Sequence, residues 1–237
     1  MPNPERRVPN IVSYNVHGCR GRDGRHDIAR CAAVVARLRP VIVGLQEVDS
    51  RDGRDAWAIF ESKLKMHAIP GPTLLGARGR YGSLLLTRFP CLAVHHHDIA
   101  VVNREPRRAI DARLATPLGP LRVLVTHLGL GWRERRHQLN RLAELLHADW
   151  SGAPVLVLGD LNVWWRPGKV GRRLHPALGH AGLPWSFPSG RPLLPLDQIW
   201  CYPQQLIAKT TADTSPEARI ASDHLPLVAE LQMLAKP

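Results

Sequence analysis

The chain has 237 residues, enough for one large α/β domain or two small ones with a sizeable hydrophobic core. Its hydrophobic share of 44% and its charged share of 22% are ordinary for a globular protein. The sequence contains no apolar run long enough to span a bilayer, and no apolar segment follows the polar N-terminus as it would in a secretory signal. We therefore expect a cytoplasmic protein with no transmembrane segment.

The charge of the chain is unusual, at a formal net +12 and a pI near 10.5. Such a potential attracts anions, including nucleic acid, a phospholipid surface or phosphorylated metabolites. An equally simple interpretation is that arginines are spread over solvated faces, because no long Lys/Arg block stands out. The four cysteines (Cys19, Cys31, Cys91 and Cys201) lack zinc-site spacing, so we expect reduced, structural thiols.

The predicted elements alternate between short apolar strands and amphipathic helices. In chain order we expect strands at 10–16, 41–45, 81–88, 91–99, 108–116, 121–126, 155–158, 196–202, 205–211 and 227–232, and helices at 28–38, 55–64, 133–150 and near 169–178. The strand at 108–116 alternates apolar and polar residues, which predicts a sheet with one face in water. Without repeats or linkers, we expect one domain over residues 1–237, with residues 1–9 flexible.

The strand at 155–158 organises the chain. It is an unbroken aliphatic run, which predicts burial on both faces. Asp160 and Asn162 follow it at a spacing of two, which in an extended chain places both side chains on the same side. An Asx turn is the simple alternative, because Asp and Asn often end a strand in this way.

Polar side chains that can bind metal or phosphate follow the apolar strands throughout the chain. They are Asn15, Glu47, His127, Asp160, Asn162, Asp197, Asp223 and His224. Each one alone is explained by a turn, a cap or a buried core histidine, but eight in one chain indicate a site. The set is rich in hard oxygen ligands and contains no cysteine, which favours Mg²⁺ or Mn²⁺ over zinc.

Six short blocks carry these residues: Ser13-Tyr-Asn15, Leu45-Gln-Glu47, Thr126-His127-Leu, Gly159-Asp-Leu-Asn162, Leu196-Asp197-Gln-Ile and Ser222-Asp-His224. In kind and order they resemble the signature blocks of the endonuclease/exonuclease/phosphatase superfamily. That group includes deoxyribonuclease-I-like nucleases, abasic-site endonucleases, neutral sphingomyelinases and inositol polyphosphate phosphatases. The resemblance implies an α/β (α+β) fold, a four-layer sandwich with two mixed β-sheets packed face to face and helices on the outside.

The resemblance also implies a role for each residue. Glu47 matches the principal metal carboxylate, with Asn15 and Asp223 near a Mg²⁺ or Mn²⁺ ion. Asp160 matches the residue that orients or deprotonates the attacking water. The phosphate-side residues are Asn162 and His127, and His224 pairs with Asp197. These groups suit phosphoryl transfer, which needs an in-line water, a base and neutralisation of charge on the equatorial oxygens.

The substrate is the least determined part. We expect an anionic phosphoester, most of all a lipid-derived or small phosphodiester, held by Arg107, Arg108 and Trp164; of Trp164 and Trp165, we expect one to pack in the core. A nuclease acting on DNA or RNA is the main alternative, although the chain lacks the long inserted loops of abasic-site endonucleases. A non-catalytic binding module is a remote alternative. The predicted partners also include a peripheral membrane contact, and the predicted state is a monomer.

Overall fold

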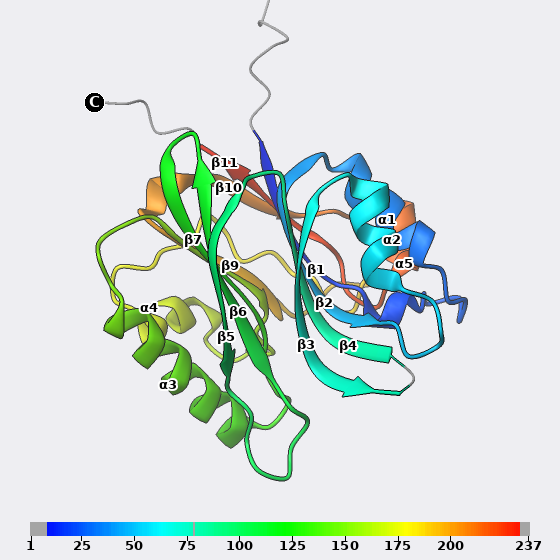
Figure 1. The fold of residues 1–237 in the computed structure, drawn as a ribbon, viewed down its shortest axis with the longest axis horizontal. Coiled ribbons are helices and arrows are strands. Elements are labelled where there is room, and N and C mark those ends of the chain that lie inside the picture. The colour runs from blue at the N-terminus through cyan, green and yellow to red at the C-terminus, as the bar shows by residue number, and fades with distance from the viewer. Residues whose placement is uncertain (1–8, 78, 233–237) are drawn as a thin grey trace, which may run out of the picture.

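Two β-sheets form the centre of the molecule, and Figure 1 shows them facing each other with helices on both outer sides. The structure is a computed structural model that describes residues 9–77 and 79–232. The six-stranded sheet has the order β10-β11-β1-β2-β4-β3, with bounds Ile207–Ala212, Leu227–Leu231, Asn10–Asn15, Pro40–Asp49, Gly79–Thr87 and His67–Gly76. The five-stranded sheet has the order β5-β6-β7-β8-β9, with bounds Cys91–Asp98, Arg108–Thr116, Gly119–His127, Val155–Asp160 and Asp197–Tyr202.

Both sheets are mixed, because β1 pairs parallel to β2 and β7 pairs parallel to β8, while the other pairings are antiparallel. The helices are α1 (Ile28–Arg37), α2 (Ala56–Leu64), α3 (Trp132–Ala148), α4 (Val170–Leu174) and α5 (Pro216–Ala221), with 3₁₀ turns at His17–Cys19, Pro167–Lys169 and Gln204–Leu206. In Figure 1, α1, α2 and α5 lie outside the six-stranded sheet, and α3 and α4 lie outside the other sheet.

Three apolar layers hold the elements together. One lies between the sheets and includes Ile11, Leu85 and Leu158, while the other two lie beneath the outer helices. The sheets approach most closely at Gly44 of β2, where a Cβ atom would collide with the side chain of Leu158. The predicted four-layer sandwich is confirmed.

Strand β8 is fully buried, as its aliphatic sequence predicted. Leu156 and Leu158 pack between the two sheets, and Val155 and Val157 pack beneath α3 and α4. Gly159 has a φ of 153°, and a Cβ atom there would collide with the carbonyl oxygen of Thr126 in β7. The glycine therefore allows β8 to stay paired with β7 up to the end of the strand.

Two elements were missed by sequence reasoning. No strand was predicted at β3, which contains Pro70 and Pro72. It is an edge strand of its sheet and pairs only with β4, so the missing N–H groups are tolerated. Helix α5 has six residues, too few to show helical periodicity. The helix predicted near 169–178 is shorter than expected and spans Val170–Leu174.

The prediction of a wet face for β6 is only partly right. Arg113 is exposed, but Asp111 is 6% exposed because Arg122 of β7 covers it. The Arg122 guanidinium donates to both carboxylate oxygens of Asp111, at 3.0 Å from Nε and 2.7 Å from Nη2. A buried ion pair therefore replaces water on this face.

The structure also bears on the expectations about membranes and cysteines. Within residues 9–77 and 79–232, no helix is long and apolar enough to cross a membrane. All four cysteines are free, and Cys91 is the exposed one. The flexibility expected for residues 1–9 falls, apart from Pro9, outside the described residues.

Candidate active site

The predicted polar residues meet at one edge of the two sheets because of the strand pairing. In the five-stranded sheet, His127 at the end of β7 pairs with Asp160 at the end of β8, and Asp160 pairs with Asp197 at the start of β9. In the six-stranded sheet, Asn15 at the end of β1 pairs with Gln46, next to Glu47. The Asn15 amide donates to Glu47 at 2.8 Å and to Asp160 at 3.0 Å, which joins the two sheets at this edge.

Two of these residues have an unusual backbone. Glu47 has a φ of 57° and Asn162 a φ of 52°, both in the left-handed region that non-glycine residues rarely adopt. Such strain persists only where the surrounding structure enforces it, and it concentrates at functional sites. At Asn162 the Asp160 side chain accepts a hydrogen bond from the backbone N–H at 3.0 Å, so the Asx turn and the convergence of the two side chains are both present.

Glu47, Asn15 and Asp223 form an oxygen-rich group around His17. The His17 Nδ1 atom lies 3.7 Å from Glu47 Oε2 and 3.6 Å from Asp223 Oδ2, so both carboxylates face the same point. Burial alone would raise the pKa of Glu47, but the nearby His17 ring and the hydrogen bond from Asn15 outweigh it and lower this pKa to about 2. Glu47 is therefore a fixed negative charge at neutral pH.

Asp160 lies at the centre of the site and is 1% exposed. Burial, together with the charge of Asp197, raises the pKa of Asp160 to about 7. A carboxylate with a pKa near neutral pH can both accept and release a proton under physiological conditions, which is the property of a general base.

Asp197 and His224 form a buried pair beside Asp160. His224 Nδ1 donates to Asp197 Oδ2 at 2.7 Å, and its Nε2 lies 3.8 Å from Asp160 Oδ2. Burial lowers the pKa of His224, but the charge and the hydrogen bond of Asp197 outweigh it and raise this pKa to about 10. His224 is therefore protonated at neutral pH, and its Nε2–H points toward Asp160.

His127 is held in the opposite state. The Arg107 guanidinium lies 2.8 Å from His127 Nδ1, and because arginine can only donate, Nδ1 accepts and Nε2 carries the proton. Burial, followed by the charge of Arg107, lowers the pKa of His127 to about 3, so the ring is neutral. Its Nε2 lies 3.4 Å from Asp160 and 3.3 Å from the Asn162 amide nitrogen, which donates to the Leu128 carbonyl.

The three predicted substrate-binding residues are placed differently from one another. Arg107 is 6% exposed and contacts His127 and Glu105, so it lies in the site as a partner of His127. Arg108 donates to the Pro72 carbonyl in β3 at 3.3 Å. Trp164 is 55% exposed and Trp165 is 71% exposed, so the expectation that one of them packs in the core is wrong: their segment turns outward after Asn162.

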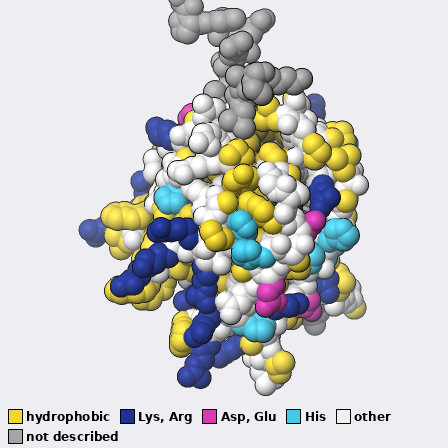
Figure 2. Space-filling model, turned by 90° about the vertical axis from the view of Figure 1, so that its left-hand side faces the viewer, with side chains coloured by type: hydrophobic (Ala, Val, Ile, Leu, Met, Phe, Trp, Pro, Cys, Tyr) yellow, Lys and Arg dark blue, Asp and Glu magenta, His cyan; other side chains and the backbone are white. Residues whose placement is uncertain are grey.

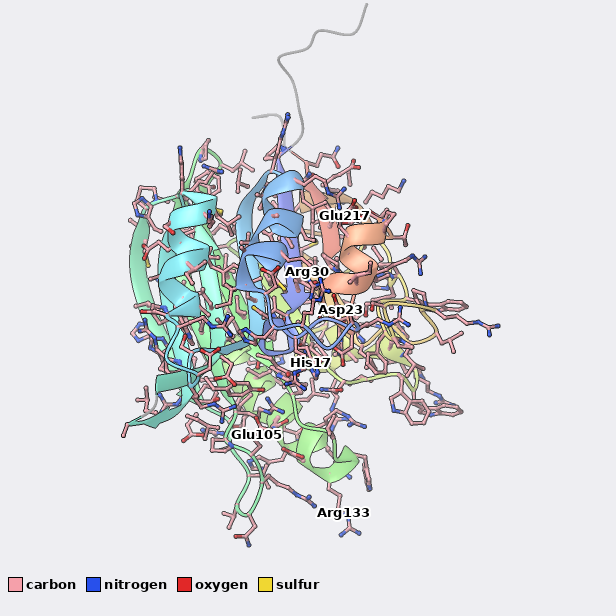
Figure 3. The ribbon with its side chains drawn as sticks, turned by 90° about the vertical axis from the view of Figure 1, so that its right-hand side faces the viewer. His17, Asp23, Arg30, Glu105, Arg133 and Glu217 are labelled. Atoms are coloured by element: carbon pink, nitrogen blue, oxygen red, sulfur yellow. The ribbon has the colours of Figure 1, made fainter. Side chains whose placement is uncertain are left out.

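A cleft of about 380 Å³ opens beside Glu47. Sequence reasoning missed most of its lining, which comprises His17, Gly18, Asp49, Arg51, Leu74, Tyr81 and Glu105 together with Glu47. Figure 3 shows His17 and Glu105 at the same end of the sheets, far from Glu217. The positions of Asp49 and Arg51, two and four residues beyond Glu47, could have marked them as site residues, whereas Tyr81 and Glu105 carried no such signal.

A further group could hold a metal ion. One ligand atom each from Asp160, Asp197 and His224 lies within 4.8 Å of the others, and all three residues are buried. Asp197 Oδ1 has no hydrogen-bond partner among the described residues, which leaves an oxygen available to a cation. His224 could join such a site only by losing the proton that Asp197 stabilises.

Comparison with known proteins agrees with this geometry. The family model described as "Endonuclease/Exonuclease/phosphatase family" matches residues 12–224. An uncharacterized protein of Escherichia coli K12, YbhP, is 32% identical over 174 residues, which are 65% of this chain and 64% of that protein. Exodeoxyribonuclease III of Haemophilus influenzae is 27% identical over 163 residues, 65% of this chain and 57% of that enzyme. The matches thus span less than two thirds of either relative.

Solved structures share the whole fold at low sequence identity. A mannosyl-6-phosphatase of Bacteroides thetaiotaomicron superposes with a TM-score of 0.78 at 17% identity, covering 95% of this chain and all of that one. An AP endonuclease of Archaeoglobus fulgidus superposes with a TM-score of 0.69 at 18% identity, covering 95% of this chain and all of that one. The family match over most of the chain and the converged site lead to one conclusion: this protein is a member of the endonuclease/exonuclease/phosphatase family.

Proposed function

We propose that this protein is a Mg²⁺-dependent phosphodiesterase that hydrolyses a lipid-derived or small phosphodiester by in-line attack of water. Members of its family are generally metal-dependent phosphoesterases. The observation that carries the proposal is the arrangement around Asp160. A neutral donor, His127, and a protonated one, His224, lie 3.4 and 3.8 Å from the same carboxylate oxygen, with the Glu47 carboxylate next to them.

The metal belongs with Glu47, Asn15 and Asp223. Hard ions such as Mg²⁺ and Mn²⁺ prefer oxygen ligands, and Glu47 stays ionised at all relevant pH values. The alternative group of Asp160, Asp197 and His224 requires deprotonation of His224, which its raised pKa opposes. A Mg²⁺ ion beside Glu47 would supply a Lewis acid for the phosphoryl oxygens.

The side chains of the chain supply the rest of the chemistry. Asp160, with its pKa near 7, takes the proton of the attacking water. His127 Nε2–H and the Asn162 amide donate to the phosphoryl oxygens, where negative charge develops. The positive charge of His224 lies beside Asp160 and stabilises the carboxylate form that accepts the proton.

A nuclease is the second candidate. The observations that favour it are the net charge of +12 and the similarity to an exodeoxyribonuclease III. An extended nucleic acid needs a long cationic groove to track several phosphates. The cleft beside Glu47 is instead small and carries three carboxylates, from Glu47, Asp49 and Glu105, against one arginine, Arg51. This local charge favours a small substrate that brings its phosphate to a metal ion.

The test is a hydrolysis screen with Mg²⁺ or Mn²⁺ across bis-p-nitrophenyl phosphate, p-nitrophenyl phosphate, phospholipids, inositol phosphates, plasmid DNA and RNA. We expect turnover of diesters and lipids to exceed turnover of the monoester and of both nucleic acids. Dominant nicking of plasmid DNA would replace this proposal with the nuclease. Mn²⁺ titration followed by electron paramagnetic resonance places the metal: Glu47→Gln should weaken binding, and Asp197→Asn should leave it nearly unchanged.

A further inference from the structure

Four tryptophans stand out from the edge of the molecule that carries the site. Trp132, Trp164, Trp165 and Trp185 are 62, 55, 71 and 58% exposed, whereas Trp57 and Trp200 are buried in the core. Burying a tryptophan is strongly favourable, so half-exposed indoles gathered in one region indicate a surface that another partner covers.

The strand pairing places these tryptophans beside the site. Trp132 follows the end of β7, and Trp164 and Trp165 follow the end of β8, the two parallel strands that end at His127 and Asp160. Trp185 precedes β9, and the ring of Phe187, two residues later, packs 4.8 Å from the His224 ring. Two aliphatic side chains in the same loops, Leu130 and Leu193, are 78 and 55% exposed. We call these six residues the apolar rim.

Positive charge accompanies the apolar rim. Residues 161–196 contain five Lys and Arg residues and no Asp or Glu, a local charge of +5 out of the net +12. All five are exposed (Arg166, Lys169, Arg172, Arg173 and Arg191), and none pairs with a carboxylate of the described chain. Figure 2 shows the side of the molecule that lies on the left in Figure 1. Along the left of this view, hydrophobic side chains and Lys or Arg side chains lie side by side. Arg133, next to Trp132, lies at the same end as His17 and Glu105 (Figure 3).

We propose that the apolar rim and its cations dock the protein on the surface of a bilayer that contains anionic phospholipid. Indole rings favour the region of the lipid headgroups, and leucines favour the acyl boundary below it. Lys and Arg near an anionic leaflet are attracted to its negative surface potential. The absence of Asp and Glu between residues 161 and 196 suits an anionic lipid surface, because such a surface would repel an acidic side chain.

A single-stranded nucleic acid is the other partner that combines aromatic and cationic contacts, since bases stack on aromatic rings along a charged groove. Here the indoles come from three separate segments of the chain, and two of the six rim residues are leucines, which give no stacking platform. The rim therefore fits a lipid surface better. Docking itself is independent of catalysis; that it delivers a lipid phosphodiester to the site rests on the proposed function.

The test measures binding to vesicles in EDTA, so that hydrolysis does not interfere. We expect the protein to co-sediment with phosphatidylglycerol/phosphatidylcholine vesicles at low salt and to stay in solution with pure phosphatidylcholine. Each neutralised cation should weaken partitioning about fivefold, so Arg166→Gln with Lys169→Gln should cost about 25-fold. As a matched control we use two exposed lysines outside residues 161–196. Lys63→Gln with Lys209→Gln should weaken partitioning to the vesicles far less.

The tryptophans are tested in the same assay. Trp165→Ala with Trp185→Ala should weaken partitioning at least about tenfold, because two large apolar side chains no longer enter the interface. The double variant should also show weaker quenching of tryptophan fluorescence by brominated lipid, with the remaining signal coming from Trp132 and Trp164. The control Leu92→Ala with Ile220→Ala removes two exposed apolar side chains elsewhere on the surface and should bind as the wild type does.

Several results would overturn the docking surface. One is the absence of binding to anionic vesicles at low salt, and another is an equal loss of vesicle binding in the control variants. A third is tryptophan-dependent binding of single-stranded DNA, or of a second copy of the chain, in place of vesicles. Hydrolysis of soluble bis-p-nitrophenyl phosphate should be unchanged in Trp165→Ala with Trp185→Ala. A protein that binds vesicles but hydrolyses no phosphoester would contradict the proposed function and leave the docking surface intact.

Discussion

At the scale of single residues, the two histidines of the site are held in opposite protonation states by different neighbours. Asp197 keeps His224 protonated, and Arg107 keeps His127 neutral with its proton on Nε2. Both rings then present an Nε2–H toward Asp160, although one is a cation and the other is not. The arginine beside His127 thus fixes the tautomer of the ring, a contact that the sequence did not show.

Arg107→Met tests that role. Loss of the guanidinium should free the His127 ring to change tautomer and lower kcat about 10- to 100-fold, the usual cost of losing a residue that orients a site ligand, with little change in KM. Nitrogen NMR of labelled histidine should show the tautomer change. The matched variant Arg113→Met, which removes an exposed guanidinium of β6 that pairs with Asp149, should change neither. A rise in KM with kcat unchanged would instead support the prediction that Arg107 binds the substrate.

Asp160 and His224 should act in the chemical step, because the charges they face change mainly in the transition state. Asp160→Asn and His224→Gln should each lower kcat about 10²- to 10⁴-fold with little effect on KM. Their atoms lie 3.8 Å apart, so the double variant should lose far less than the product of the two single losses. Steady-state kinetics of the three variants gives the comparison, and fully multiplicative losses would show that they work separately.

At the scale of elements, the pair of Asp111 and Arg122 joins β6 to β7 beneath α3. Burial raises the pKa of Asp111, but the hydrogen bonds and charge of Arg122 outweigh it and leave this pKa below its usual value. Because the folded-state pKa is depressed, the pair stabilises the fold above the usual Asp pKa of about 3.9. That stability is lost as the pH falls through the depressed folded-state pKa.

Asp111→Asn should therefore lower the free energy of unfolding by about 3–5 kcal/mol at pH 7, since it removes the carboxylate that pairs closely with the buried Arg122 and leaves only the half-exposed Asp149 at 3.8 Å. The difference from the wild type should shrink as the pH falls below about 4. Urea unfolding at a series of pH values measures both effects. Asp149→Asn, which alters a half-exposed partner of the same arginine, should cost no more than about 1 kcal/mol. A pH-independent loss in Asp111→Asn would exclude the ion pair as its cause.

The sequence predicted those elements whose local pattern agrees with their final environment. Buried strands such as β8 and the long amphipathic helix α3 were evident from periodicity alone. Strand β3 was not, because its prolines are tolerated only at the edge of a sheet, and edge position depends on the whole topology. In the same way, the blocks indicated Glu47, Asp160 and His224, while Arg107 found its partner His127 only through the pairing of β6 with β7.

Across the whole molecule, a large positive charge coexists with an acidic cleft beside Glu47. The cations of residues 161–196 lie on loops beside the site, whereas Glu47, Asp49 and Glu105 line the cleft itself. Binding of a small substrate should therefore depend weakly on the net charge of +12. Association with an extended polyanion would depend on it strongly.

Salt dependence separates these cases. For a soluble phosphodiester, KM should fall only modestly between about 200 and 50 mM salt, because one or two phosphates are held. A protein that contacts six or more phosphates of duplex DNA changes its affinity roughly 10³-fold or more over that range. Steady-state kinetics at four salt concentrations gives the slope. A steep slope with DNA, together with nicking of supercoiled plasmid at low enzyme, would favour the nuclease.

Turnover of Glu47→Gln at limiting Mg²⁺ tests most directly whether hydrolysis depends on a metal ion held at Glu47. The amide keeps the shape of the side chain but removes the fixed negative charge, so turnover should fall at least about 100-fold while the melting temperature stays near that of the wild type. The exposed control Glu217→Gln should retain full activity. Wild-type turnover in Glu47→Gln, or full activity of the native protein in EDTA, would exclude a catalytic metal ion held at Glu47.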